Sequence, residues 1–387
     1  MLRSGFLPTF FLIAASVVTA QTPSPKDVDI AAPDGIKLRA TSFAAAKPGP
    51  AVLLLHMCNT ARKSWEPVAR ELSEKGINAL TIDNRGFGES GGPKFEGAPP
   101  EVDKKLQEKW PGDFDAAYQF LLSQPGVDKS HTGAGGGSCG VDNAIKLAER
   151  HPDVKVLVLL SGSTDAAGMN LISQKTELPI FTAAAADDEY NSATLPLMQW
   201  FSQISGSPRT KFEGFQNGGH GTEIFGPHPE LVHHIVAFFV DTLLISPAGS
   251  KVTPRRTPAY EFWRQANQPG GAARAEKEFH EARQRDPNAP LFPEFLVNLL
   301  GYDRLQAGDK EDAIQWFKLN TEAYPASANA QDSLSDGYLA AGQKDLALAA
   351  EEKCVELLPN DKGNANFRDQ LKKHAEEKIA ELKSEQK

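Results

Sequence analysis

Two strongly apolar runs, residues 51–56 (AVLLLH) and 154–160 (VKVLVLL), constrain the fold of this chain more than any other feature. Continuous apolar runs of this length are typical of strands that are buried on both faces of a sheet. Apolar residues at helical spacing mark residues 64–75 and 113–123. Strand-like and helix-like segments alternate in this way over residues 27–245. The alternation predicts an α/β fold, with a mostly parallel sheet and helices on both of its faces.

The remaining elements of this predicted domain follow weaker signals. A hairpin is expected where a Pro-Asp-Gly turn separates two strand-like segments. Residues 131–136 are expected as a strand only because the alternation requires one, since their glycines favour a loose strand or the close approach of another backbone. The expected strands are 27–30, 35–43, 78–83, 131–136, 180–185 and 211–216, and the further expected helices are 142–150 and 230–244.

The sequence changes character after residue 245. Residues 246–257 carry Pro, Gly and Ser without apolar periodicity and are expected to form a linker. Beyond it, six residues recur at an offset of 34: Leu305, Ala307, Gly308, Lys310, Ala313 and Pro325 recur as Leu339, Ala341, Gly342, Lys344, Ala347 and Pro359. This period resembles that of tetratricopeptide repeats, which are helix–turn–helix units of 34 residues.

The resemblance implies an all-α helical-repeat domain over residues 258–387, in contact with the first domain. A divergent unit is expected at residues 260–285 and a polar capping helix at 366–382. The Ala-Gly pair of each unit is expected to let two helices approach closely. Helical-repeat stacks often bind peptides or partner chains in a concave groove, so a protein partner is one prediction.

The N-terminal residues have the features of a secretory signal. Arg3 precedes an apolar stretch at residues 6–18, and a small-residue ending at residues 18–20 predicts cleavage after Ala20. The apolar stretch is too short to span a bilayer, so no membrane span is expected. The mature protein is therefore predicted to be exported, either periplasmic or secreted.

Charge and cysteine content exclude several classes of partner. The formal net charge of −9 and the lack of a Lys/Arg cluster argue against binding nucleic acid. The three cysteines form no Cys-x-x-Cys pair and the histidines no metal-ligand spacing, the nearest group being His228, His233 and His234. We therefore expect neither a metal nor another cofactor.

Residues 136–140 (GGSCG) match the pattern Gly-x-Ser-x-Gly and lie between an expected strand and an expected helix. Three further segments follow the expected strands in order. Residues 83–90 (DNRGFGES) follow the strand at 78–83, Asp187 and Asp188 follow the strand at 180–185, and His220 follows the strand at 211–216.

In this order the residues resemble the α/β-hydrolase family over residues 27–245, and residues 123–128 (SQPGVD) are similar to its dienelactone-hydrolase and acyl-peptidase-like branches. The resemblance implies that Ser138 is the nucleophile and His220 the general base. It favours Asp188 over Asp187 as the acid that orients the imidazole. It also implies an oxyanion hole made by the backbone N–H of Cys139 and that of Cys58 or Met57.

Each of these residues also has an ordinary structural interpretation. Ser138 could cap a helix, His220 could lie in a solvated loop, and the Asp pair could be turn residues. Residues 133–138 could form a dinucleotide loop, but the third glycine of that motif is missing. Cys58 and Cys139 are expected as buried free thiols, and the alternative is a disulfide that blocks the oxyanion hole.

The sequence therefore predicts a serine hydrolase that cleaves a carboxylic ester through an acyl-serine. The substrate class is a small-molecule ester or a short acyl or peptide compound. A peptidase or amidase of the same fold remains an alternative, as does an inactive binding protein that uses the helical repeats. Only residues 161–178 separate two successive strands where lids are usually inserted, so an open site is expected, with residues 91–111 as the main loop over it.

Overall fold

The computed structural model describes residues 23–385 except 191–192, 288–291, 362 and 364. The expected signal sequence at residues 1–20 lies outside the described residues. Within the described part, every helix is too short or too polar to cross a membrane.

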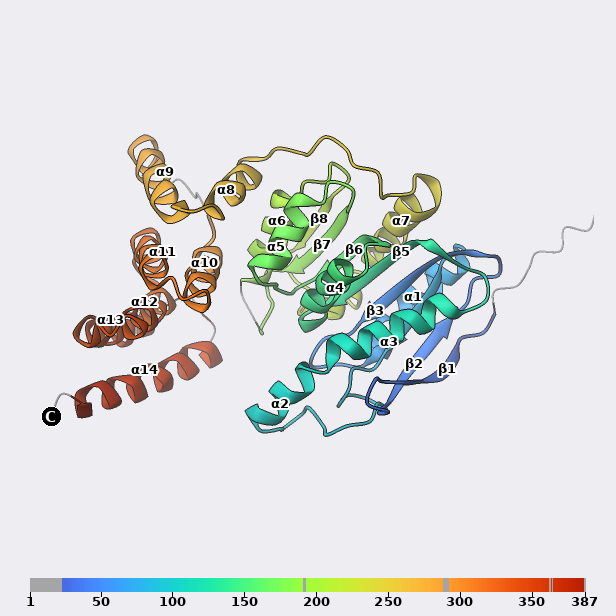
Figure 1. The fold of residues 1–387 in the computed structure, drawn as a ribbon, viewed down its shortest axis with the longest axis horizontal. Helices are drawn as coiled ribbons and strands as arrows, with labels where there is room; N and C mark the ends of the chain where they lie inside the picture. Colours follow the sequence, from blue (N-terminus) through green and yellow to red (C-terminus); the bar gives the residue numbers. More distant parts are fainter. Residues whose placement is uncertain (1–22, 191–192, 288–291, 362, 364, 386–387) are drawn as a thin grey trace, which may run out of the picture.

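The first part of the chain is built on an eight-stranded sheet with the order β1-β2-β4-β3-β5-β6-β7-β8 (Figure 1). β1 and β2 form the predicted antiparallel hairpin, β2 is antiparallel to β4, and the other neighbours are parallel. The predicted α/β class is therefore confirmed. The strands are β1 (Lys26–Ala31), β2 (Lys37–Phe43), β3 (Gly49–Leu55), β4 (Asn78–Ile82), β5 (Val127–Gly137), β6 (Val154–Leu160), β7 (Ile180–Ala185) and β8 (Lys211–Phe215).

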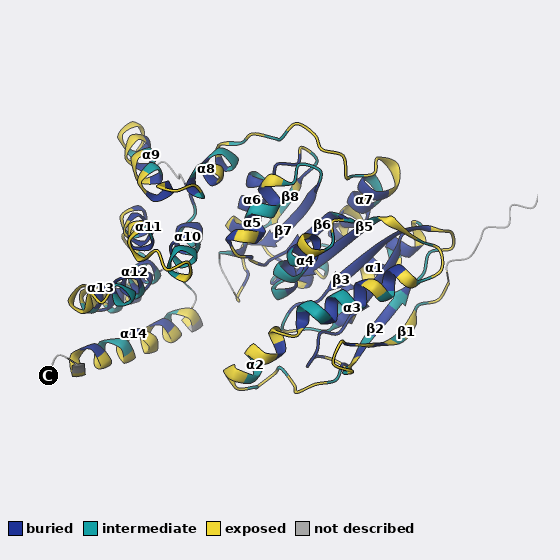
Figure 2. Cartoon of the chain, viewed as in Figure 1, coloured by how far each residue is buried: buried dark blue, intermediate teal, exposed yellow. Residues whose placement is uncertain are grey.

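Helices cover both faces of the sheet, so each face has its own apolar core. In β6, Leu157 and Leu159 belong to one core, whereas Val156 and Val158 belong to the other, because successive side chains point to opposite faces. Figure 2 shows β3 and β6 buried along almost all of their length, whereas β5 is buried only over its second half. The first core packs under α3 (Trp110–Ser123), α4 (Cys139–Arg150), α5 (Ala166–Gln174) and α6 (Thr194–Ile204), and the second under α1 (Glu66–Glu74) and α7 (Glu230–Val240).

β5 lies between β3 and β6 in spite of its glycines. A methyl group on Gly133 would lie 2.8 Å from the Phe239 ring, and one on Gly135 would lie 2.7 Å from the Leu54 side chain. At these two glycines the neighbours are large side chains of the second core, whereas the expected close approach of another backbone is found at Gly136, where an added methyl would overlap the Gly140 carbonyl. Gly133 and Gly135 both lie within the strand, which excludes the alternative of a dinucleotide loop.

Three helices occupy segments for which no helix was predicted. Residues 91–111, expected as a loop, contain α2 (Pro100–Gln107), and α5 and α6 follow β6 and β7. Proline suggested a loop, but Pro100 stands in the first turn of α2, where its missing N–H removes no helical hydrogen bond. The predicted helix at 230–244 is α7 followed by a π-helical turn, η3 (Asp241–Ile245), and two short 3₁₀ helices are η1 (Arg62–Trp65) and η2 (Gly221–Phe225).

Residues 246–257 contain no helix or strand, and the chain beyond them is helical. The pair α10–α11 and the pair α12–α13 begin 34 residues apart, as the sequence repeat predicts. Membership of the tetratricopeptide family stays a prediction. The helices are α8 (Pro258–Ala266), α9 (Gly271–Arg285), α10 (Glu294–Gln306), α11 (Lys310–Ala323), α12 (Ala328–Ala340), α13 (Lys344–Leu357), the short η4 (Leu358–Asn360) and α14 (Ala365–Glu385).

The repeated Ala-Gly pair has a different role from the one expected. Gly308 and Gly342 have φ angles of 83° and 75°, and a methyl group on either would meet nothing within 4 Å. These glycines therefore end their helices in the left-handed conformation rather than permit close helix packing. Close packing depends on Gly301 and Gly337, where an added methyl would collide with the Phe317 ring.

The helical part packs against the first part along α5 and α6 (Figure 1). The Trp263 indole N–H donates to Asn170 Oδ1 at 3.1 Å, and the rings of Phe262 and Trp200 lie 6.2 Å apart. The apolar core of this face of the sheet continues without interruption into α8, α9 and α10.

Candidate active site

Ser138 occupies a strained turn between the end of β5 and the start of α4, with φ 52° and ψ −121°. Two glycines make the turn possible. A methyl on Gly136 would overlap the Gly140 carbonyl, and one on Gly140 would lie 2.6 Å from the Leu55 carbonyl oxygen. The spacing of the Gly-x-Ser-x-Gly motif therefore has a steric cause, and an unfavourable serine conformation of this kind is typical of functional sites.

The backbone of Ser138 is anchored on both sides. Its N–H donates to the Leu160 carbonyl at 2.9 Å, and its carbonyl accepts from the Val141 N–H at 2.9 Å. Ser138 stands at the N-cap position of α4, but its side chain makes no capping hydrogen bond. The capping alternative is therefore not supported, and the half-buried hydroxyl is free to face the cavity described below.

His220 and Asp188 form a buried pair at the carboxyl ends of β8 and β7. The Nδ1–H of His220 donates to Asp188 Oδ2 at 2.7 Å, and both side chains are at least nine-tenths buried. This arrangement leaves Nε2 as the imidazole nitrogen without the proton. The interpretation of His220 as a solvated loop histidine does not fit this burial.

Asp187 and Asp188 have distinct roles in the fold. Asp187 accepts the N–H groups of Gly218 and Gly219, at 3.1 and 3.0 Å, and so fixes the loop before His220. Asp188 accepts the Tyr190 N–H at 3.0 Å through its other oxygen. The structure brings Asp188 to His220, as the resemblance implied.

The sequence analysis missed two neighbours of this pair. The Thr194 hydroxyl donates to Asp188 Oδ2 at 2.7 Å, and the Tyr190 ring lies over the His220 ring with centroids 5.0 Å apart. Neither residue belongs to a recognisable motif. An Asp followed six residues later by a Thr is too common a pattern to indicate a contact.

Ser138 and His220 line one cavity of about 630 Å³. Trp110 and Pro111 supply its apolar wall from the start of α3, and Asn143 and Lys146 from α4 supply polar groups. Gln107 of α2 also lines it, so the segment 91–111 does border the site as expected. The cavity is large enough for a small organic substrate.

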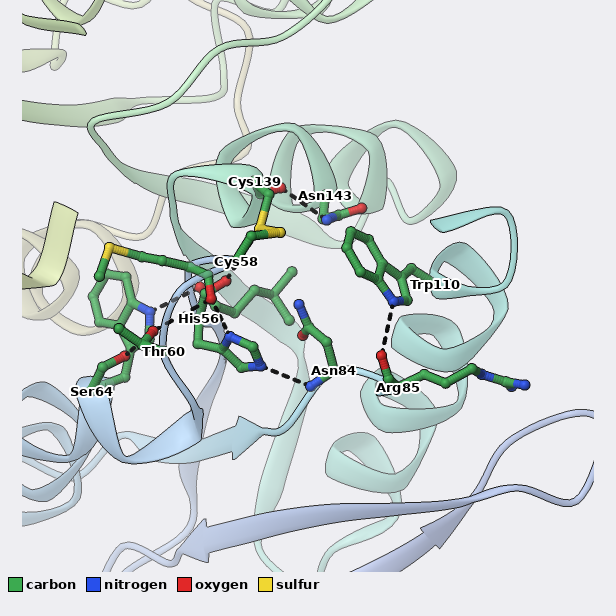
Figure 3. Close-up of a disulfide and its surroundings, with 12 residues drawn as sticks. His56, Cys58, Thr60, Ser64, Asn84, Arg85, Trp110, Cys139 and Asn143 are labelled. Atoms are coloured by element: carbon green, nitrogen blue, oxygen red, sulfur yellow. Dashed lines mark hydrogen bonds between the residues drawn. A yellow bond between two sulfur atoms is a disulfide. The ribbon is translucent and has the colours of Figure 1, made fainter. Parts of the chain in front are cut away.

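The loop after β3 is held by His56 and Met57. The buried imidazole of His56 accepts the Asn84 N–H on Nε2 at 2.9 Å and donates from Nδ1 to the Met57 carbonyl at 2.6 Å (Figure 3). Burial lowers the pKa of His56, so the ring is neutral, as these two bonds require. The Met57 side chain fills the space left by Gly137 and Gly221.

Cys58 and Cys139 are joined by a disulfide with a Cα–Cα distance of 5.9 Å (Figure 3). The expectation of two free thiols is therefore wrong. The loop after β3 and the first residue of α4 meet at the same edge of the sheet, which places the two side chains within bridging range. Cys354 is the free, buried cysteine.

The turn at residues 83–90 is held by two buried ion pairs. Arg62 Nη1 lies 2.5 Å from Asp83 Oδ2, and Arg85 Nη2 lies 2.7 Å from Asp113 Oδ1. Asp83 also accepts the Glu89 N–H at 2.9 Å. This turn therefore has a structural role, and the ion-pair partner of Asp83 is Arg62, 21 residues earlier in the sequence.

Within the described residues, one group has the geometry to hold a metal ion: Glu276, His280 and Glu322. All three are exposed, and none lines the cavity. The histidines considered in the sequence bond separate partners, His228 with Asn217, His233 with Glu71 and His234 with Glu213.

Ser138 follows β5, Asp188 follows β7 and His220 follows β8. The sheet that carries them is parallel except for the antiparallel hairpin at its start. This is the α/β-hydrolase fold. The α/β-hydrolase part of the chain places all three groups at one edge of its sheet, the edge formed by the carboxyl ends of the parallel strands.

The known proteins that are similar in sequence match only part of this chain. A family model described as the C-terminal part of BAAT and acyl-CoA thioester hydrolases matches residues 113–211, which include Ser138 and Asp188. The thiohydrolase aneE of Aspergillus aculeatus is 34% identical over 134 residues, which is 34% of this chain and 40% of that protein. The chain therefore matches less than half the length of this relative.

Solved structures similar to this chain include two esterases. One from Pyrococcus furiosus has a TM-score of 0.47 and 19% identity, covering 57% of this chain and 92% of that one. A cold-adapted esterase from an Arctic intertidal metagenomic library has a TM-score of 0.45 and 23% identity, covering 57% and 94%.

Proposed function

We propose that this protein is a serine hydrolase that cleaves a carboxylic ester through an acyl-serine on Ser138. One observation carries the proposal: a serine in a strained strand-to-helix turn and a histidine bonded to a buried carboxylate line the same cavity. A serine hydroxyl is a weak nucleophile on its own, and an adjacent imidazole oriented by a carboxylate makes it reactive.

In the first half of the proposed reaction, Ser138 Oγ attacks the carbonyl carbon of the ester while His220 Nε2 takes the hydroxyl proton. The carbon–oxygen bond to the leaving group then breaks, and His220 returns the proton to the leaving alkoxide. In the second half, water attacks the acyl-serine by the same route. The carboxylic acid leaves and Ser138 is restored. Asp188 keeps the proton on Nδ1 and stabilises the imidazolium.

Two backbone N–H groups would bind the oxyanion that forms on the carbonyl oxygen. Cys139 is the first residue of α4, where helix geometry leaves the N–H without an intrahelical partner. Cys58 follows the anchored Met57 and lines the same cavity. One such donor contributes about a hundredfold or more to the rate.

A thioester is the second candidate substrate. The comparisons favour it, because the matched family model and the aligned relative both carry names of thioester or thiol-ester hydrolysis. The same steps apply, with a thiolate as the leaving group. The two candidates are separated by the ratio of kcat/KM for an oxygen ester and a thioester that share one acyl group. An amide with that acyl group tests the peptidase alternative in the same series.

A fluorophosphonate probe tests the proposal against the alternative of an inactive binding protein. Wild type and the Ser130→Ala variant should be labelled, because Ser130 is an exposed serine near the start of the same strand. Ser138→Ala should not be labelled. Absence of labelling in the folded wild type would exclude the serine-hydrolase proposal.

We further propose that the protein is exported, with the mature chain beginning at Gln21. The disulfide supports this location, because such bonds persist mainly in oxidising compartments. Mass spectrometry of the protein from its native host should find the N-terminus at residue 21, and an intact Met1 in the mature protein would contradict export by cleavage.

A further inference from the structure

We propose that the Cys58–Cys139 disulfide is a positioning element of the oxyanion hole, holding the two backbone N–H donors at the separation that catalysis needs. The inference rests on the proposed hydrolase function. It adds a specific role for the disulfide between two cysteines that are 81 positions apart in the sequence. It differs from the blocking role considered from the sequence, in which a bridge would close the hole.

The bridge joins the two residues that would supply the donors. Cys139 directly follows Ser138, and Cys58 lies in the turn after β3 (Figure 3). Within the described residues, neither backbone N–H donates to a carbonyl or a side chain. Two unpaired N–H groups beside a strained serine are what an oxyanion hole requires.

The separation of the two residues also fits. Two donors that each lie roughly 2.7–3.1 Å from one oxygen are at most about 6 Å from each other. The Cα atoms of Cys58 and Cys139 are 5.9 Å apart, and a disulfide limits that distance to at most about 6.8 Å. The bridge therefore keeps the two backbone segments close together beside the serine, as two donors to one oxyanion must be.

The disulfide ties the turn after β3 to α4, and the other anchor of this turn is Met57. Met57 is buried and its carbonyl is bonded, but Cys58 is half-buried and Asn59 is exposed. The turn is closed by Thr60, whose N–H and hydroxyl both donate to the Met57 carbonyl, at 3.2 and 3.4 Å. In the described residues, Cys58 itself makes no hydrogen bond to α4, so the disulfide is its direct link to that helix.

The blocking alternative does not fit the cavity. Cys58 and Cys139 line the same cavity of about 630 Å³ as Ser138 and His220, so the bridged protein retains an open volume at the site. We therefore expect the oxidised protein to be the active form.

The test compares oxidised and reduced protein, both kept folded. Hydrolysis of a p-nitrophenyl ester gives kcat and KM, a trifluoromethyl ketone reports binding of a tetrahedral oxyanion, and far-UV circular dichroism reports folding. The variants Cys58→Ser and Cys139→Ser remove the bridge without reductant. Cys354→Ser is the matched control, because burial raises the pKa of the Cys354 thiol to about 12 and keeps it unreactive.

We expect reduction, or either bridge variant, to lower kcat at least about tenfold while KM changes less than about threefold, since loss of a whole donor costs about a hundredfold. Affinity for the ketone should fall in parallel. Cys354→Ser should keep wild-type activity and the same response to reductant.

Three outcomes would overturn the inference. They are equal kcat in folded oxidised and reduced protein, higher kcat after reduction, and failure of every bridge-free form to fold at 25 °C, which would make the bond a requirement of folding alone. The first two leave the serine-hydrolase proposal intact, because the oxidised protein is then still active. An oxidised protein that neither hydrolyses esters nor takes the fluorophosphonate fails the proposed function itself.

Discussion

The Thr194 hydroxyl donates to Asp188 Oδ2 at 2.7 Å, the same oxygen that accepts the His220 Nδ1 proton. Thr194 is the first residue of α6 and almost fully buried. It therefore helps to fix the carboxylate oxygen that the imidazole also bonds, in a place where the side chain cannot exchange its partner for water. This contact makes Thr194 a positioning residue of the proposed site.

Thr194→Val should lower kcat about tenfold or more with little change in KM, because the carboxylate loses the hydroxyl that orients it. Loss of a hydrogen bond to a charged group corresponds to about 1.5–3 kcal/mol. Thr194→Ser retains the hydroxyl and should recover most of the rate. Steady-state kinetics of the two variants decide this, and equal rates for valine and wild type would contradict a positioning role.

Gly136→Ala should destabilise the protein by about 3 kcal/mol or more and abolish labelling of Ser138. The added methyl would overlap the Gly140 carbonyl and lie 2.8 Å from the Val141 nitrogen, so the turn must open. Gly226→Ala is the control, because its φ of −67° suits alanine and the nearest atom is 3.4 Å away. Urea unfolding should show a change within about 1 kcal/mol for the control.

Asp83→Asn should lower the free energy of unfolding by about 3 kcal/mol, because the buried Arg62 guanidinium loses its one buried carboxylate and retains only the more exposed Glu89 and Asp27. The exposed ion pair of Arg39 and Asp29 serves for comparison. Asp29→Asn should change stability by less than about 1 kcal/mol. Chemical unfolding at low and high salt distinguishes the two, since only the exposed pair is screened. Equal effects of the two variants would contradict the importance of burial.

Glu351 makes the stability of the helical part pH-dependent. Lys378 Nζ lies 3.0 Å from Glu351 and also bonds Asp332 and Asp336, so three carboxylates share one ammonium group. Burial, and then repulsion from Asp332, raises the pKa of Glu351 to about 7. Because the folded protein keeps this proton where the unfolded chain has lost it, stability should fall as pH rises from about 4.5 to about 7, by about 3 kcal/mol.

Glu351→Gln should remove most of this pH dependence and unfold at higher urea concentration than wild type at pH 8. The control is Glu352→Gln, which changes an exposed neighbour paired with Lys383 and should retain the wild-type profile. Urea titrations at pH 5 and pH 8 measure both. A Glu351→Gln profile that follows wild type would show that the carboxyl titrates normally.

Short-range sequence patterns predicted much of the fold. Runs of apolar residues predicted β3 and β6, and the 34-residue offset predicted the spacing of the helix pairs from α10 to α13. The order of the serine, carboxylate and histidine along the chain indicated a carboxylate and a histidine that are bonded to each other, and a serine that lines the same cavity as the histidine. The predictions failed where a residue's role depended on what packs against it: Gly133 and Gly135 accommodate Phe239 and Leu54, and Gly308 ends a helix instead of packing against one.

Local preferences are encoded by neighbouring residues, so the sequence by itself determined the strands, the serine turn between its two glycines, and the succession of elements that makes an α/β sheet. Contacts between distant segments depend on which ends of those elements meet in space. Only the tertiary structure showed that Cys58 is bonded to Cys139, that Thr194 supports the Asp188 carboxylate, and that Asp188, which the family resemblance favoured, bonds His220. The Cys58–Cys139 and Asp188–His220 pairs form because parallel strands bring their carboxyl ends, and the loops that follow them, to a single edge of the sheet.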